Sequence, residues 1–112
     1  MAKPEEARIA RTESVFRHVN ERIAETVEHV ESTDAEFVCE CADVDCHERI
    51  EAPLREYEEV RAKPTTFLVA EGHEVPAYEH VRTKRRDYLI VEKVGRRLAA
   101  AVRRSDPRAD PA

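Results

Sequence analysis

The sequence predicts a small α+β protein: a long N-terminal amphipathic helix, a small and mainly antiparallel sheet with a cysteine-rich hairpin, and a short C-terminal helix. Three observations point to this fold. Apolar residues recur every seven positions near the N-terminus, three cysteines gather within eight residues, and short apolar runs are separated by turn residues. A chain of 112 residues is short enough to form a single domain.

The composition is polar, so the core is expected to be small. Charged residues make up 38% of the chain and aromatic residues 5%. The net charge of −5 hides a segregation of sign, because residues 34–80 sum to −9 and residues 81–104 sum to +7. Such segregation indicates that one part meets a partner of opposite charge or that the two parts meet each other.

We expect a cytoplasmic protein with no membrane contact. No apolar run approaches the ~20 residues that a bilayer span needs. The N-terminal residues also lack the apolar segment of a secretory signal. In a reducing compartment, clustered cysteines in odd number are typical of metal ligands or reactive thiols rather than of a disulfide framework.

Residues 1–33 are predicted to contain the N-terminal amphipathic helix, about 25 residues long and beginning at Pro4. At 1.5 Å per residue its length is roughly 38 Å, more than the diameter of so small a core. One apolar face of this helix is therefore a candidate site for a protein partner or for self-association, and the alternative is that the helix packs on its own domain. The predicted partner-binding residues are Ile9, Phe16, Val19 and Ile23, and Val30 continues the repeat.

Residues 34–94 are predicted to form the α+β domain that contains the cysteines. Pro53 starts a second helix, and Pro64 limits it because the residue before a proline avoids helical geometry. Beyond the sheet, residues 95–105 form a basic C-terminal helix and residues 106–112 a disordered tail. The expected strands are Phe37–Cys41, Cys46–Glu51, Thr66–Ala70, Glu79–Thr83 and Tyr88–Glu92.

The cysteines have the spacing C-x-C-x4-C. In a strand, side chains at positions i and i+2 share a face, so Cys39 and Cys41 point the same way, and a hairpin turn brings Cys46 opposite them. Three thiolates form a soft site that suits Zn²⁺, which prefers four tetrahedral ligands with sulfur at ~2.3 Å. The hairpin is therefore predicted to bind zinc.

The fourth zinc ligand is predicted to be His73. His47 directly follows the last cysteine and would point to the opposite face of an extended segment, whereas His73 follows Gly72 in a turn that can swing back over the cluster. Asp43, Asp45 or a water molecule could also occupy the fourth position. Zinc would compensate for a thin core, since structural zinc contributes on the order of 10 kcal/mol to folding.

Other kinds of chemistry compete with a structural zinc site. Two of the cysteines could form a redox switch, the cluster could hold iron–sulfur or a catalytic metal, or the cysteines could be buried without any metal. The sequence contains no zinc-deaminase spacing, no H-E-x-x-H, no phosphate-binding glycine loop and no G-x-S-x-G. We therefore do not expect an enzyme.

The basic C-terminal region is a candidate for nucleic-acid binding. Its alternative role is a solvated face that pairs with the acidic middle of the chain. Tyr88 is the one aromatic residue among these charges, and the overall acidity disfavours non-specific DNA binding. The candidate residues are Arg82, Lys84, Arg85, Arg86, Arg96 and Arg97.

Two motifs, C-E-C-A-x3-C at Cys39–Cys46 and G-H-E-V-P at Gly72–Pro76, occur together with Phe16-Arg17 and Val19–Ile23 in the helix. In this combination the chain resembles a group of short bacterial proteins whose function is unknown. The resemblance covers nearly the whole chain and implies that the helix and the cysteine domain belong together as one unit. It implies no activity.

The function that these observations favour is that of a non-enzymatic zinc-binding protein acting as an interaction or regulatory module. The N-terminal helix would supply the face for its partner. The alternatives are a nucleic-acid-associated regulator that uses the basic region 82–104 and a thiol redox sensor.

Overall fold

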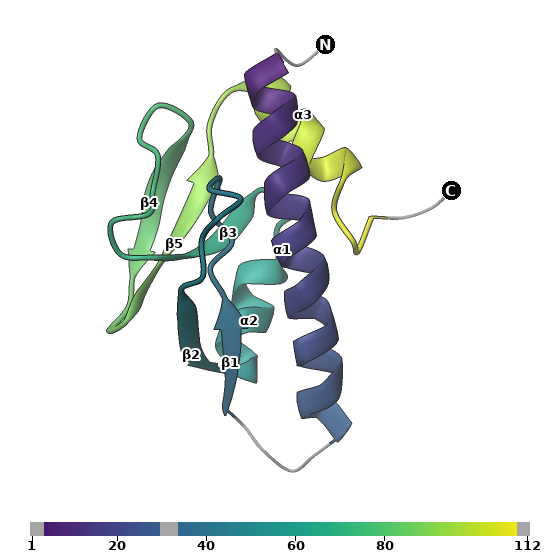
Figure 1. The fold of residues 1–112 in the computed structure, drawn as a ribbon, viewed down its shortest axis with the longest axis vertical. Helices are drawn as coiled ribbons and strands as arrows, with labels where there is room; N and C mark the ends of the chain where they lie inside the picture. Colours follow the sequence, from purple (N-terminus) through teal and green to yellow (C-terminus); the bar gives the residue numbers. More distant parts are fainter. Residues whose placement is uncertain (1–3, 30–33, 110–112) are drawn as a thin grey trace.

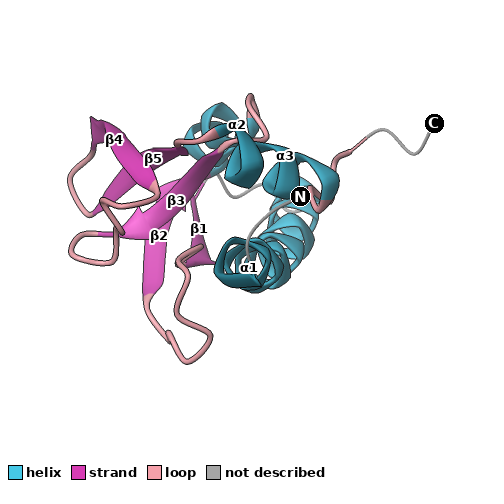
Figure 2. Ribbon diagram, turned by 90° about the horizontal axis from the view of Figure 1, so that it is seen from above, coloured by secondary structure: helices cyan, strands magenta, loops and turns pink. Residues whose placement is uncertain are grey.

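A long helix, α1 (Pro4–His29), lies beside two small antiparallel sheets in the computed structural model, which describes residues 4–29 and 34–109 (Figure 1). One sheet contains β1 and β2, and the other has the strand order β3-β5-β4. The helices gather on one side of the strands (Figure 2). The predicted α+β class is confirmed. After α1 the elements are β1 (Asp34–Val38), β2 (Arg49–Pro53), α2 (Leu54–Arg61), β3 (Thr66–Ala70), β4 (Glu79–Lys84), β5 (Tyr88–Lys93) and α3 (Arg96–Arg104).

Local sequence signals set several of these boundaries. Pro53 is the N-cap of α2, where its extended backbone precedes the first helical turn. Gly95 has φ of 89°, which a residue with a side chain rarely adopts, and it lets the chain turn from β5 into α3. The predicted hairpin of β4 and β5 is present, with a register irregularity between Val81 and Thr83. Among the described residues, no helix has the length and apolar character that a membrane span requires.

The core lies between the helices and the strands. Phe37 of β1 and Tyr57 of α2 stack with ring centroids 4.4 Å apart, and both side chains are completely buried. Such an aromatic pair contributes about 0.5–1.5 kcal/mol beyond the burial of its area. The other large apolar side chains at the centre are Ile50, Val60, Phe67, Leu68, Val69, Val91, Leu98 and Val102.

The buried face of α1 differs from the predicted apolar stripe. Ile9 packs in the core with 2% of its surface exposed, but the following turns bury Glu13, Arg17 and Asn20. Val19, a member of the stripe, remains 40% exposed. Hydrophobic periodicity therefore locates the two ends of this face, where Ile9 is buried and Ile23 packs against the core, but not its middle, which polar side chains occupy.

Arg17 attaches the middle of α1 to the start of β3. Its guanidinium lies 3.5 Å from the centroid of the Phe67 ring and donates hydrogen bonds to the carbonyl oxygens of Pro64 (2.7 Å) and Thr66. The carboxylate of Glu40 is 3.9 Å away. Loss of one partner of a buried charge costs about 3–5 kcal/mol, so these contacts hold α1 firmly in its position.

A second buried ionic group attaches α1 to the three-stranded sheet. The ammonium of Lys93 on β5 donates to Glu13 of α1 (2.8 Å) and to Glu79 of β4. Burial raises the pKa of Glu13 to about 7, and the charge of Lys93 opposes that shift. One cation between two carboxylates thus links α1 to the β4–β5 hairpin, which is distant from it in the sequence.

Two residues of the predicted disordered tail, 106–112, contact the helices in the described part of the chain. Asp106 accepts a hydrogen bond from Arg61 of α2 and lies 3.9 Å from Arg17 of α1. The remaining residues, 110–112, lie outside the described part of the chain. Two further carboxylates, one from α1 and one from α2, pair with Arg108: Glu21 and Glu58.

Candidate metal centre

The three cysteines lie in the loop between β1 and β2. The sequence predicts strands that contain them, but β1 ends at Val38 and β2 begins at Arg49, so this prediction is wrong in its boundaries. The ladder extends by one backbone bond, from Cys39 N–H to Glu48 O (3.1 Å). A turn then closes the loop, with Cys46 N–H donating to the carbonyl of Asp43 (3.0 Å). Loop geometry, rather than strand alternation, therefore makes the thiols converge.

Four side chains converge at this loop: Cys39, Cys41, Cys46 and His73. Their ligand atoms all lie within 4.8 Å of one another. Nδ1 of His73 is 3.4 Å from Sγ of Cys46 and 3.8 Å from Sγ of Cys39. Four ligands placed 2.3 Å from a common centre stand about 3.8 Å apart in a tetrahedron, so the group can hold a metal ion after small adjustments.

His73 reaches the cysteines from the turn that follows β3. Gly72 has φ of 91°, and its N–H donates to the carboxylate of Glu74 (2.8 Å), while His73 N–H donates to Ala70 O (3.0 Å). The end of β3 also contacts the cluster directly, because Ala70 N–H donates to Sγ of Cys39 (3.2 Å). The histidine and the thiols are thus brought together by two loops from different sheets.

The competing candidates for the fourth ligand are not part of this group. His47 is exposed and is not among the four clustered donors. Asp43 and Asp45 are exposed too, and one carboxylate oxygen of Asp43 accepts a hydrogen bond from the N–H of Asp45 (2.9 Å), which stabilises the turn.

Glu40 holds the C-x-C segment in position. Its N–H donates to Leu68 O (2.7 Å) and its carboxylate accepts from Leu68 N–H (3.1 Å), so this residue pairs with β3 much as a strand would. The same carboxylate accepts from the amide of Asn20 (2.8 Å), which also bonds N–H and C=O of Val38 (2.7 and 2.9 Å). Sequence reasoning missed both residues, because charged and amide side chains are usually exposed.

The thiols share protons unequally. A hydrogen bond from Cys39, assisted by His73, lowers the pKa of Cys41 to about 5, while burial opposes the shift. The same hydrogen bond, together with burial, raises the pKa of Cys39, and burial raises the pKa of Cys46. The crowded thiols therefore resist the loss of all three protons. A bound cation would favour the thiolate form of each cysteine.

A cleft of about 290 Å³ opens beside the cluster. Its walls include two of the four clustered side chains, Cys41 and His73, together with Asp43. Since Cys39 and Cys41 are almost fully buried while Cys46 and His73 are half-buried, an ion can enter from this side.

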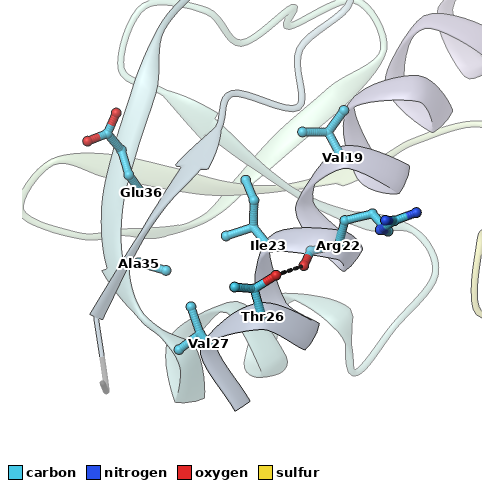
Figure 3. Close-up of a pocket in the computed structure, with 7 residues that line it drawn as sticks. All are labelled: Val19, Arg22, Ile23, Thr26, Val27, Ala35 and Glu36. Carbon is cyan, nitrogen blue, oxygen red and sulfur yellow. Dashed lines mark hydrogen bonds between the residues drawn. The ribbon is translucent and has the colours of Figure 1, made fainter. Parts of the chain in front are cut away.

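The predicted partner-binding residues are distributed over three places. Ile9 belongs to the core, and Phe16 lines a small hollow with Val15 and Val44. Val19 and Ile23 line a larger groove between α1 and β1, of about 580 Å³ (Figure 3). Val30 lies outside the described residues. The groove is lined by Val19, Arg22, Ile23, Thr26, Val27, Ala35 and Glu36.

The predicted basic residues divide into two groups. Three residues of the β4–β5 hairpin form ion pairs: Arg82 with Glu92 (3.2 Å), Lys84 with Glu71 (3.3 Å) and Arg85 with Glu59 (2.9 Å). Three others are exposed and form no ion pair within residues 4–29 and 34–109: Arg86, Arg96 and Arg97.

No protein-family model, no curated protein and no solved structure matches this chain.

We predict that Glu40→Ala lowers the free energy of unfolding by on the order of 3 kcal/mol, because it leaves the buried donors of Leu68 and Asn20 without an acceptor. Alkylation of Cys39 and Cys41 in metal-free protein should accelerate as well. Urea denaturation and iodoacetamide labelling measure the two effects. The matched control is Glu48→Ala, an exposed glutamate of the same loop, and an equal effect of both substitutions would show that Glu40 has no such role.

Proposed function

We propose that the chain is a zinc-binding protein in which the metal joins the β1–β2 loop to the turn after β3. The observation that carries this proposal is the convergence of three thiols and one imidazole within 4.8 Å. Thiolate ligands select soft or borderline ions, and a Cys₃His set is a familiar tetrahedral zinc environment. Four protein ligands fill that coordination sphere and leave no position for a substrate, which favours a structural role over an enzymatic one.

A metal at this site would connect the two sheets of the fold. The two sheets share no ladder, and near the cluster the backbone N–H and the carboxylate of Glu40 connect them through hydrogen bonds with the backbone of Leu68. A metal held by Cys39, Cys41 and Cys46 on one side and His73 on the other would close the same junction. Structural zinc contributes on the order of 10 kcal/mol to folding, which is large beside the stability of a small domain.

We predict that His73→Ala weakens zinc binding by on the order of 100-fold or more, since it removes one of four ligands, whereas His47→Ala leaves zinc binding unchanged. Competition with a chromophoric chelator measures the affinity, and native mass spectrometry counts the bound zinc. Both histidines follow the C-x-C pair in the sequence, one beside Cys46 and one in the turn after β3, and they provide a matched pair.

Equal loss of zinc in both variants would contradict the assignment of His73. Purified protein without metal, but two mass units lighter because two thiols have formed a disulfide, would instead support a redox sensor and overturn the zinc proposal.

The groove between α1 and β1 supports an interaction role for the zinc-stabilised fold. It presents Val19 and Ile23 along an apolar floor, with Arg22 on one side and Glu36 on the other (Figure 3). In a two-fold dimer the same patch faces itself, so Arg22 of one copy can meet Glu36 of the other. This charge arrangement favours self-association as the use of the groove.

We predict that Val19→Glu abolishes self-association, because a carboxylate on the apolar floor would be buried without a partner. The matched control is Val81→Glu on β4, where a valine of similar exposure (48% against 40%) lies outside the groove. Sedimentation equilibrium of the two variants and the wild type measures the effect at unchanged zinc content. A wild-type chain that remains monomeric, or an equal effect of both variants, would contradict self-association through this groove.

A further inference from the structure

The last helix has one face made of cations. Positions 96, 97, 103 and 104 of α3 fall within an arc of about 120° when successive residues turn by 100°. The opposite side of α3 contributes Leu98, Ala101 and Val102 to the core. These buried residues set the orientation of α3 about its own axis. The outer face of the helix is formed by four exposed side chains: Arg96, Arg97, Arg103 and Arg104.

These arginines differ from most other basic residues of the region, although Arg86 in the β4–β5 turn is also exposed and forms no ion pair with a described residue. On the β4–β5 hairpin, Arg82, Lys84 and Arg85 each pair with a carboxylate. The four arginines of α3 form no ion pair with any residue that the structure describes. One carboxylate, that of Glu6, lines the hollow beside the start of the helix. The positive charge of the C-terminal region therefore remains available on α3 and is largely neutralised on the hairpin.

Helix stability does not account for the arrangement. Cations in the last turn suit the helix dipole, as Arg103 and Arg104 do. Arg96 and Arg97 lie in the first turn, where the dipole disfavours positive charge, and that turn holds no acidic residue. The pair at the start of α3 thus opposes the local electrostatics of the helix.

We propose that the outer face of α3 binds the phosphate backbone of duplex nucleic acid without reading its sequence. Guanidinium groups match phosphate oxygens with two parallel hydrogen bonds, which gives arginine its preference for phosphate. Arg96 and Arg103 are seven residues apart, which is about 10 Å along a helix, and the side chains extend further. The two arginine pairs can therefore contact phosphates on both sides of the major groove of B-DNA, which is about 12 Å wide, or of the wide minor groove of duplex RNA.

The composition of the face distinguishes a duplex from other polyanions. Binding of single strands relies on aromatic side chains that stack on bases, and the face has none. Binding to an anionic membrane relies on apolar side chains that enter the lipid, but the apolar side of α3 is buried in the protein. Within the described residues, no ion pair joins the acidic segment 34–80 to this face, so its positive charge is not neutralised by that segment.

The test is fluorescence anisotropy with a 20-base-pair DNA duplex across a series of salt concentrations, using the full chain. Four phosphate contacts give a slope of about −3.6 in log affinity against log salt, so affinity falls about 150-fold between roughly 50 and 200 mM. In R96Q/R97Q two contacts are lost, and the slope should change to about −1.8. R82Q/K84Q removes the same charge from the hairpin and should leave the slope near the wild-type value.

A duplex RNA of the same length separates phosphate recognition from DNA-specific recognition, and equal binding of the two supports the proposal. Vesicles that contain phosphatidylglycerol and a single-stranded oligonucleotide complete the set of probes. Four results would overturn the proposal: no duplex binding at low salt, equal losses in the two double variants, preference for the single strand, or preference for the vesicles. Circular dichroism and zinc content of each variant confirm that the fold is retained.

Discussion

The structure depends on the junction where the β1–β2 loop meets the end of β3. The N–H of Glu40 donates a hydrogen bond to the carbonyl of Leu68, and the carboxylate of Glu40 accepts one from the N–H of Leu68. The N–H of Ala70 donates to the thiol of Cys39. These contacts align the two sheets, which share no ladder of their own. The same contacts set the positions from which three thiols and His73 converge. Alignment of the sheets and the geometry of the proposed zinc site therefore depend on the same contacts.

The helix α1 completes this junction with polar side chains. Asn20 satisfies the backbone of Val38 and the carboxylate of Glu40, while Arg17 lies over the ring of Phe67. Since buried polar groups are costly when unpaired, the helix can dock in only one register. This docking leaves Val19 exposed at the groove, so the proposed self-association surface depends on how α1 packs on the core.

Local signals in the sequence predict most of the elements, because prolines, glycines and apolar periods act over a few residues. The strand Thr66–Ala70 and the helix Arg96–Arg104 occur where the sequence places them. The loop position of the cysteines could not be predicted in this way, since the end of β1 is decided by the bond of Glu40 to a strand 28 residues later. The convergence of the three cysteines with His73 is nevertheless predictable. The spacing of the cysteines and a histidine that follows a glycine indicate a metal site whether or not the cysteines lie in strands.

The central claim is that a single zinc ion closes this junction. X-ray absorption spectroscopy at the zinc edge, on protein purified without added metal, tests it most directly. The proposed site predicts one zinc per chain with three sulfur ligands at about 2.3 Å and one nitrogen ligand at about 2.0 Å. A zinc ion surrounded by oxygen and nitrogen alone, or a folded chain with no zinc and unchanged thermal stability in the presence of a chelator, would contradict it.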